Sequence, residues 1–279
     1  MNPDRIYRQY RDEALAKQIT ASEYSTFVAM PFADQYSYHS REIYQDVIQA
    51  AAECANRKGA TRHLFAQPKR VDDGSGTAIV ITEEIVVRIL ESHLFIADLT
   101  FENPGVVLET GIAMGLKSNR QIILITQGDL KDLHFDLRNN NVMTYNHPGS
   151  VEQIADALIA GANAFESDCE LYIESVSESL SADATHCLNA YGRLHRDSPG
   201  QAASLHRGYA KKIFGEHDMA EFRYENATRE LLNRRLIWTD YKVGAVPGGD
   251  AYGMHATDLG WAFIEHMWRD LRRKPAQNT

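Results

Sequence analysis

The chain has 279 residues, of which 44% are hydrophobic and 24% are charged. This composition excludes collagen-like, coiled-coil and disordered proteins, and the length allows two domains of ordinary size. The longest strongly apolar stretches, residues 78–87 and 106–116, are too short to cross a bilayer, and the N-terminus lacks the apolar region of a signal peptide. We therefore expect a cytoplasmic protein without membrane segments. The three cysteines match no metal-binding spacing and are too few for a disulfide framework, so we expect reduced thiols.

The charge is unevenly distributed along the chain. The net charge is -9, yet residues 201–279 carry 12 Lys and Arg against 10 Asp and Glu, whereas residues 139–192 carry eight acidic residues and no Lys or Arg. The C-terminal part would therefore bind a polyanion most easily. This change in composition predicts four segments, which are an N-terminal helix (1–24), a first domain (25–165), an acidic helical linker (166–182) and a second domain (183–279).

The first domain has alternating strand and helix patterns. Predicted strands cover residues 25–32, 63–67, 93–99, 121–126 and 142–145, and predicted helices cover residues 40–58, 78–91, 104–117 and a segment from 151 onward. The strands are continuously apolar, as in a parallel sheet that is covered by helices on both faces. We predict an α/β fold with a flavodoxin-like five-stranded parallel sheet.

The second domain has a different pattern. Helical periodicity covers residues 183–195, 201–214 and 219–235, and a two-stranded hairpin with a Gly/Pro-rich tip at residues 244–249 follows. A last helix begins at Thr257. Three helices, a hairpin and a closing helix predict a C-terminal winged-helix domain. The run from Tyr252 to Phe263 resembles the second wing strand and the following helix start of many winged-helix domains.

The ends of the predicted strands contain the first candidates for a binding site. In an open parallel sheet, ligands bind beyond the carboxyl ends of the strands. The residues there are Met30, Pro31 and Phe32 after the first strand, Arg70, Asp72 and Thr77 after the second, Asp98 at the end of the third, and Gln127 after the fourth. The glycine-rich segment 74–77 could hold a phosphate at the next helix N-terminus, although a plain turn explains it equally well.

Glu109 stands alone in an apolar helix. Asn103 and Pro104 are typical of a helix start, as an N-cap followed by proline at the first helical position. Glu109 is the only charged residue between Asn103 and Leu116. Burial of an unpaired carboxylate is costly or forces its protonation. Glu109 therefore either forms a structural ion pair with Arg70 or Arg138, or it has a functional role.

Several of these segments occur in the order and spacing of a known family. Residues 27–32 (FVAMPF), 70–73 (RVDD), 96–100 (IADLT), 103–113 (NPGVVLETGIA), 122–127 (IILITQ) and 135–138 (FDLR) resemble the nucleoside 2-deoxyribosyltransferase-like family. The resemblance covers about residues 25–147 and implies that Glu109 is the nucleophile at the anomeric carbon of the sugar. One acidic position of the family falls near Glu83 or Glu84. Another falls on Asn103, and this departure favours hydrolysis, or a different nucleotide, over exchange of deoxynucleosides.

The residue types fit this chemistry. Cleavage of an N-glycosidic bond passes through an oxocarbenium-like state, which one carboxylate stabilises or traps while another group serves the leaving base. Glu109 suits the first role, Glu84 or Asp98 could hold ribose hydroxyls or move protons, and Arg70 could hold a phosphate. Asp98 could equally be a strand-end cap. We expect a nucleotide or NAD as substrate and no cofactor or metal. NAD is suggested by analogy with the Toll/interleukin-receptor NAD glycohydrolases, which use a glutamate in a comparable place.

The helix at residues 219–235 would be the recognition helix of the winged-helix domain. Arg223, Asn226, Arg229 and Asn233 can face a nucleic-acid groove, and Lys242 lies near the wing. Acidic residues on the same helix make a protein-docking role an equal alternative. A deoxyribosyltransferase-like domain followed by a winged helix is similar to the effectors of certain retrons, in which reverse transcriptase and an RNA–DNA hybrid hold the effector.

Three functional hypotheses follow. The leading one is an N-glycosidase effector that cleaves NAD or a nucleotide, as the toxin of an antiphage defence system that a partner controls through residues 183–279. The second is a nucleotide-salvage deoxyribosyltransferase or nucleotide hydrolase. The third is a non-enzymatic nucleotide sensor that regulates transcription through its winged helix. We also expect a homo-oligomer.

Overall fold

The structure is a computed structural model, and it describes residues 3–32, 34, 37–70, 81–146, 149–197, 203–204, 207–215, 219–246 and 249–273. The chain forms two compact units, Met1–Asp168 and Cys169–Thr279. The boundary between them falls within the long helix α7 (Ser150–Ser179). Among the described residues, no helix combines the length and the apolar character that a membrane span requires.

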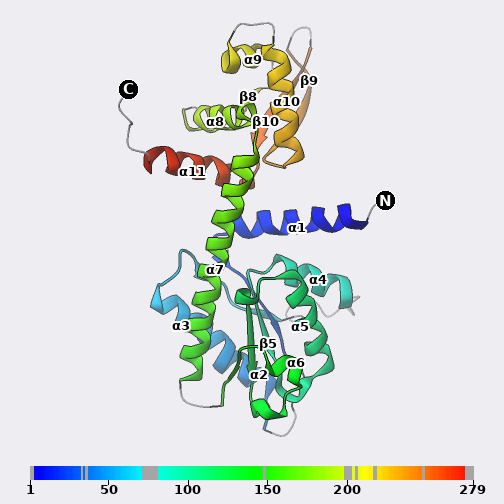
Figure 1. Cartoon of the computed structure of the whole chain (residues 1–279), viewed down its shortest axis with the longest axis vertical. Helices are drawn as coiled ribbons and strands as arrows, with labels where there is room; N and C mark the ends of the chain where they lie inside the picture. Colours follow the sequence, from blue (N-terminus) through cyan, green and yellow to red (C-terminus); the bar gives the residue numbers. More distant parts are fainter. Residues whose placement is uncertain are drawn as a thin grey trace. The chain divides into compact units, whose positions relative to one another are not determined.

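A five-stranded parallel sheet forms the centre of the first unit (Figure 1). Its strands are β2 (Thr26–Ala29), β4 (Lys69–Arg70), β5 (Leu94–Asp98), β6 (Ile122–Thr126) and β7 (Val142–Thr144). They lie in the order β4-β2-β5-β6-β7, and every neighbouring pair is parallel. Counted along the chain, this is the order 2-1-3-4-5 of flavodoxin-like sheets. The predicted α/β class and five-stranded parallel sheet are confirmed.

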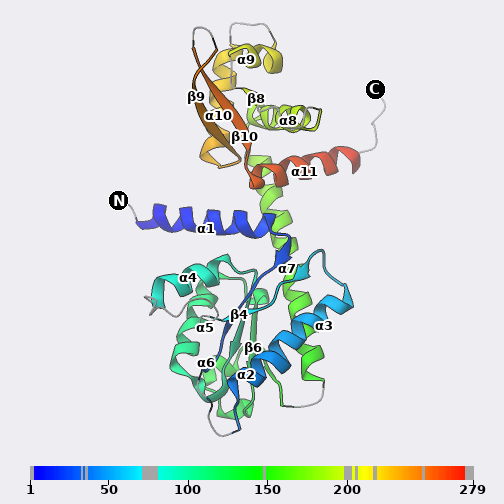
Figure 2. The same cartoon turned by 180° about the vertical axis from the view of Figure 1, so that it is seen from behind.

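Helices cover both faces of this sheet. The helices of this unit are α1 (Pro3–Thr20), α2 (Ser40–Ile43), the π-helical η1 (Tyr44–Gln49), α3 (Ala50–Lys58), α4 (Ile81–Glu91), α5 (Pro104–Leu116), α6 (Phe135–Arg138) and α7, with short 3-10 turns η2 (Thr100–Glu102), η3 (Asn119–Gln121) and η4 (Leu130–Asp132). Figures 1 and 2 show α3 and α7 on one face, with α4 and α5 on the other. Phe27, Phe95 and Leu124 lie in the core between the sheet and α5. Two-sided coverage explains why β5 is buried along its whole length.

The second strand of the sheet differs from the prediction. The predicted strand at residues 63–67 contributes only β3 (Leu64–Phe65), which pairs with β1 (Glu23–Tyr24) in a separate two-stranded sheet. The fifth member of the main sheet is instead β4, which follows Pro68 and contains two cationic residues. An edge strand is commonly short and charged, so apolar patterning does not reveal it. The prediction for this strand was wrong for that reason.

The second unit contains helices and a small antiparallel sheet. Its elements are α8 (Ala182–Asp197), β8 (Ala203–Ser204), α9 (Arg207–Phe214), α10 (Ala220–Asn233), β9 (Ile237–Val246), β10 (Gly249–Ala256) and α11 (Asp258–Arg273). The strands lie in the order β8-β10-β9, and both pairs are antiparallel. The predicted hairpin is present. The helix predicted at residues 201–214 was wrong at its start, because α9 begins at Arg207 and residues 203–204 form β8, which is too short to show a period in the sequence.

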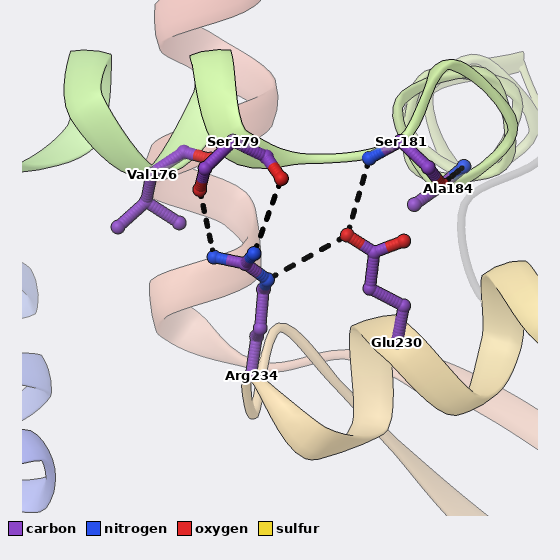
Figure 3. Close-up of polar contacts among 6 residues, drawn as sticks. All are labelled: Val176, Ser179, Ser181, Ala184, Glu230 and Arg234. Atoms are coloured by element: carbon purple, nitrogen blue, oxygen red, sulfur yellow. Dashed lines mark hydrogen bonds and ion pairs between the residues drawn. The ribbon is translucent and has the colours of Figure 1, made fainter.

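Two contacts show how the helices of the second unit pack. A Cβ added to Gly260 of α11 would lie 1.9 Å from the carbonyl oxygen of Leu236, so only glycine allows this approach. The second contact is at the C-terminal end of α10, where the Arg234 guanidinium donates to the Ser179 Oγ at 2.9 Å and to the Ser179 carbonyl oxygen at 3.1 Å (Figure 3). Glu230 pairs with Arg234 and accepts from the Ser181 backbone N–H at 3.1 Å (Figure 3). The C-terminal end of α10 is therefore fixed to the turn between α7 and α8.

Candidate functional site

Asp98, at the carboxyl end of β5, is the centre of a buried polar cluster. Its Oδ1 accepts from the backbone N–H of Thr100 at 3.1 Å and from the Thr100 hydroxyl at 2.5 Å. Its Oδ2 accepts from the hydroxyls of Tyr38 at 3.0 Å and Tyr145 at 2.9 Å. Asp98 has no exposed surface, and burial raises its pKa, while these hydrogen bonds act in the opposite direction.

These contacts decide the role that Asp98 can take. A carboxylate offers about four acceptor positions, and four donors occupy those of Asp98. The geometry therefore favours the strand-end cap over direct contact with ribose hydroxyls. Burial also raises the pKa of Tyr38 and Tyr145, so both phenols stay protonated and donate to Asp98. The Thr100 hydroxyl in turn accepts from the backbone N–H of Gln127 at 2.9 Å, which joins the ends of β5 and β6.

Glu109 is the carboxylate that the sequence singled out. It lies half-buried on α5, and burial raises its pKa from 4.5 to about 7. Within the described residues, Glu109 has neither a hydrogen bond nor an ion pair, and the expected alternative of pairing with Arg70 or Arg138 is absent there. A carboxylate that is desolvated without a partner is typical of a functional site more than of a scaffold.

The start of α5 is built as predicted. The Asn103 Oδ1 accepts from the backbone N–H of Gly105 at 3.0 Å and of Val106 at 3.4 Å, and Pro104 occupies the first helical position. This cap fixes the register of the helix and therefore the position of Glu109. Because its oxygen serves as the cap, Asn103 has only its side-chain N–H groups left for a substrate.

The loop after β2 contains three of the predicted contact residues, Met30, Pro31 and Phe32. Met30 and Pro31 are buried, whereas Phe32 is 54% exposed. Because Met30 and Pro31 are buried, they can support a binding site only by packing beneath its surface, whereas the Phe32 ring is accessible to a ligand. The Arg70 guanidinium lies 5.3 Å from the centroid of this ring.

Arg70 is held among aromatic groups. It is 9% exposed, and its guanidinium lies 5.3 Å from the Tyr44 ring as well as from Phe32, with the Met30 Sδ 3.9 Å from its Nη1. It also lines a cavity of about 730 Å³ that lies along β4. The cavity is lined by Ser25, Thr26, Phe27, Tyr44, Gln49, Gln67, Pro68, Lys69, Arg70, Arg88, Glu91 and Ser92. Neither Glu109 nor Asp98 contributes to it, so Arg70 and Glu109 do not share this cavity.

Glu84 has an ion-pair partner on its own helix. Its carboxylate pairs with Arg88 of α4, and the Arg88 Nη1 donates to the Arg70 carbonyl oxygen at 3.2 Å. These contacts give Glu84 a structural role beside the proposed catalytic one. Asp72 and Thr77 lie outside the described residues, as does the start of the helix that was predicted from residue 78.

The sequence did not point to Phe101. This residue lies in the turn after β5, has a left-handed φ of 62° and is 51% exposed. Its ring meets the Tyr38 ring at a centroid distance of 5.7 Å and an interplanar angle of 66°. No signal in the sequence predicts a left-handed phenylalanine, because this region ordinarily favours glycine or asparagine.

Helix α10 of the second unit divides the predicted contact residues into two groups. Asn226, Arg229 and Asn233 are exposed. Arg223 instead forms a bidentate pair with Asp183, with Nε–Oδ2 at 3.0 Å and Nη2–Oδ1 at 2.5 Å, and stacks on Phe214 at 4.4 Å. Arg223 therefore helps to pack α10 against α8 and α9, in addition to the partner contact that the sequence predicts for it. The side chain of Lys242 lies outside the described part of the structure.

Comparisons with protein-family models, with curated proteins and with solved structures find no match to this chain. Among the described residues, no group of three His, Cys, Asp or Glu side chains could hold a metal ion. The three cysteines are buried and have free thiols.

Proposed function

We propose that the first unit is an N-glycosidase that cleaves NAD or a nucleotide, with Glu109 as its nucleophile. The observation that carries this proposal is the half-buried carboxylate of Glu109, which has no hydrogen-bond or ion-pair partner among the described residues and lies on a helix that begins at the carboxyl edge of a doubly wound sheet. That edge is where such sheets bind ligands. The resemblance to the nucleoside 2-deoxyribosyltransferase-like family, which matches this position to its nucleophile, supports the same assignment.

The reaction would proceed in two displacements. The Glu109 carboxylate attacks the anomeric carbon, the bond from that carbon to the base nitrogen breaks, and the bonding electrons leave with the base. A nucleobase takes up a proton from solvent as it leaves, whereas the nicotinamide of NAD, which is cationic in the substrate, leaves as a neutral molecule. Water then attacks the glycosyl-enzyme ester at the same carbon, releases the sugar and restores the carboxylate. The low polarity around Glu109 favours the spread-out charge of the transition state over a localised anion, because desolvation weakens the ionised ground state.

We also infer that the second unit is a winged-helix domain. The element order α8, β8, α9, α10, β9, β10 and the antiparallel β8-β10-β9 sheet support this inference, with the β9–β10 hairpin as the wing. In this arrangement α10 is the recognition helix, and its exposed Asn226, Arg229 and Asn233 would contact a nucleic-acid-containing partner. Such a partner would restrain the glycosidase, as in the retron-type antiphage toxins that the domain order resembles.

The test is base release from nucleotides and NAD by the full chain, combined with mass-spectrometric profiling of metabolites in cells that express it. Glu109→Gln keeps the size of the side chain but removes the nucleophile, so turnover should fall by about a thousandfold or more. Glu53→Gln, an exposed carboxylate on α3, is the matched control and should retain full turnover. Near-wild-type turnover by folded Glu109→Gln would overturn the assignment, and sequence-specific operator binding without turnover would favour the nucleotide sensor.

A further inference from the structure

Phe101 is a large aromatic residue in an unfavourable backbone conformation. Its φ of 62° lies in the left-handed region, and Glu102, the next residue, has a φ of 45°. Bulky side chains rarely adopt this conformation, and such strain is concentrated at binding and catalytic sites. Burial of the ring does not offset the strain, because 51% of Phe101 is exposed. The fold thus keeps a half-exposed phenylalanine in a backbone conformation that is unfavourable for its side chain.

Neighbouring groups hold this conformation in place. The backbone N–H of Glu102 donates to the Leu99 carbonyl oxygen at 2.9 Å, which closes the turn around Phe101. The Glu102 carboxylate accepts from the backbone N–H of His134, and Thr100 is bonded to Asp98 on the other side. Residues on both sides of Phe101 are hydrogen-bonded, Thr100 to Asp98 and to the backbone N–H of Gln127, and Glu102 to His134, so the turn that carries the ring has a defined position.

The ring lies beside the Asp98 cluster. Tyr38, whose hydroxyl donates to Asp98 at 3.0 Å, meets the Phe101 ring at an interplanar angle of 66°, so the two rings do not stack face to face. The Tyr38 hydroxyl is also 3.5 Å from the Pro31 carbonyl oxygen of its own loop, and its hydrogen bond to Asp98 joins the loop after β2 to the end of β5. Glu109 lies on the helix that begins at Pro104, about 8 Å along its axis, at the same end of the unit.

We propose that the Phe101 ring is the stacking surface for the planar base of the substrate, so that the site selects ligands with an aromatic heterocycle. This inference rests on the proposed function, since it names the class of the leaving group. Every nucleobase can stack on an aromatic face, whatever its hydrogen-bonding groups. Phe101 would therefore distinguish nucleotides from sugar phosphates that lack a base, and Phe32 would be a second contact at the rim.

The experiment measures binding apart from turnover. Full-length Glu109→Gln, which should bind substrate without cleaving it, is titrated calorimetrically with NAD, AMP, GMP, CMP and UMP, and with ribose 5-phosphate as the base-free ligand. The same titrations are repeated after adding Phe101→Leu, which keeps apolar bulk but removes the aromatic face. Phe101→Trp tests rescue, and Phe222→Leu, an equally exposed phenylalanine of the second unit, is the matched control.

We expect at least one nucleotide to bind, and its affinity to fall about tenfold or more with Phe101→Leu and to recover with Phe101→Trp. Ribose 5-phosphate should bind with the same affinity to Glu109→Gln with and without Phe101→Leu. Phe222→Leu should leave the affinity for every ligand unchanged. The inference is overturned if no nucleotide or NAD binds, or if Phe101→Leu leaves every affinity unchanged or weakens ribose 5-phosphate to the same degree. Base release by the wild-type protein is scored separately, so Phe101-dependent binding without turnover would reject the proposed hydrolysis and keep the stacking site.

Phe101→Gly separates binding from a structural role. Glycine adopts positive φ without penalty, so this variant should melt at a higher temperature than the wild type while losing nucleotide affinity. A lower melting temperature for Phe101→Gly would show that the ring stabilises the fold and would contradict the inference.

Discussion

Replacement of Glu109 by glutamine should stabilise the protein at neutral and alkaline pH while removing its activity. Burial raises the pKa of Glu109 from 4.5 to about 7, so the folded chain holds this proton more tightly than the unfolded chain does. Between pH 4.5 and 7 the unfolded chain releases the proton and the folded chain keeps it. The free energy of unfolding therefore falls as pH rises through this interval, and the loss is complete above pH 7.

The size of this effect follows from the same interval. A difference of one pH unit between the two pKa values is worth about 1.36 kcal/mol, so an interval from 4.5 to about 7 gives at most about 3 kcal/mol. Glu109 is only half-buried, and solvent screening reduces this value to roughly 1–2 kcal/mol. Glutamine carries no charge, so Glu109→Gln should recover this amount at pH 8 and almost none at pH 4.5.

Urea unfolding of the wild type and of Glu109→Gln, measured from pH 4.5 to 8.5, checks the prediction. The stability difference should grow between pH 4.5 and 7 and then stay constant, and Glu53→Gln should show no such trend. A less stable Glu109→Gln at pH 8 would refute the reasoning. It would mean that the carboxylate stabilises the fold through a partner, as in the structural ion pair with Arg70 or Arg138 that the sequence left open.

Two further predictions concern titrating groups of the first unit. If Glu109 acts as the nucleophile, its ionised form is the active one, so base release at saturating substrate should rise with pH through an apparent pKa near 7; a fall over this range would assign Glu109 as an acid instead. Burial lowers the pKa of Lys117 from 10.5 to about 7, and its ammonium donates to the Ser92 carbonyl oxygen, which also accepts from Gln18. The unfolded chain binds the lysine proton more tightly than the folded chain does, so the protonated lysine reduces the free energy of unfolding, and this loss is largest below pH 7 and shrinks toward pH 10. Lys117→Met should therefore stabilise the protein by more than about 1 kcal/mol at pH 6 and by less at pH 10. Thermal melts at both pH values test this prediction.

The first unit was predictable where burial leaves a sequence pattern. Strands β5 and β6 lie within short, continuous apolar runs, which are typical of buried parallel strands. The pair Asn103–Pro104 predicts the first residue of α5 correctly. The isolation of Glu109 in an apolar helix likewise follows from the residues around it in the sequence. These features are local, so the pattern of neighbouring residues is sufficient to locate them.

The rest depends on contacts between distant segments. The role of Asp98 is set by Tyr38 and Tyr145, which come from other parts of the chain, and nothing beside Asp98 in the sequence indicates that both of its oxygens are occupied. The conformation of Phe101 depends on the hydrogen bond from His134 to Glu102. Arg223 illustrates the same limit, because helical spacing places it on a face but cannot show that Asp183 of another helix binds it.

The arginines of α10 provide a test of partner binding that the Asp183 pair makes specific. Arg223→Ala removes the partner of the Asp183 carboxylate, whose pKa Arg223 lowers, and should destabilise the second unit. Loss of binding by this variant would therefore be ambiguous. Arg229 is exposed and has no hydrogen bond or ion pair with another described residue, so its charge is available to a phosphate.

Arg229→Glu should leave the melting temperature and base release unchanged, yet weaken the binding of a nucleic-acid-containing partner. Surface substitutions away from a core change stability by less than about 0.5 kcal/mol, whereas reversal of a phosphate-contacting charge removes one released counterion and adds repulsion. Gel-shift titrations at about 50 and 200 mM salt should show a shallower salt dependence for Arg229→Glu than for the wild type. Equal affinity and equal salt dependence for both proteins would exclude α10 as a nucleic-acid contact and leave protein docking as its role. Loss of base release with the fold intact would instead mean that the second unit completes the active site, because no residue of α10 belongs to the carboxyl edge of the sheet.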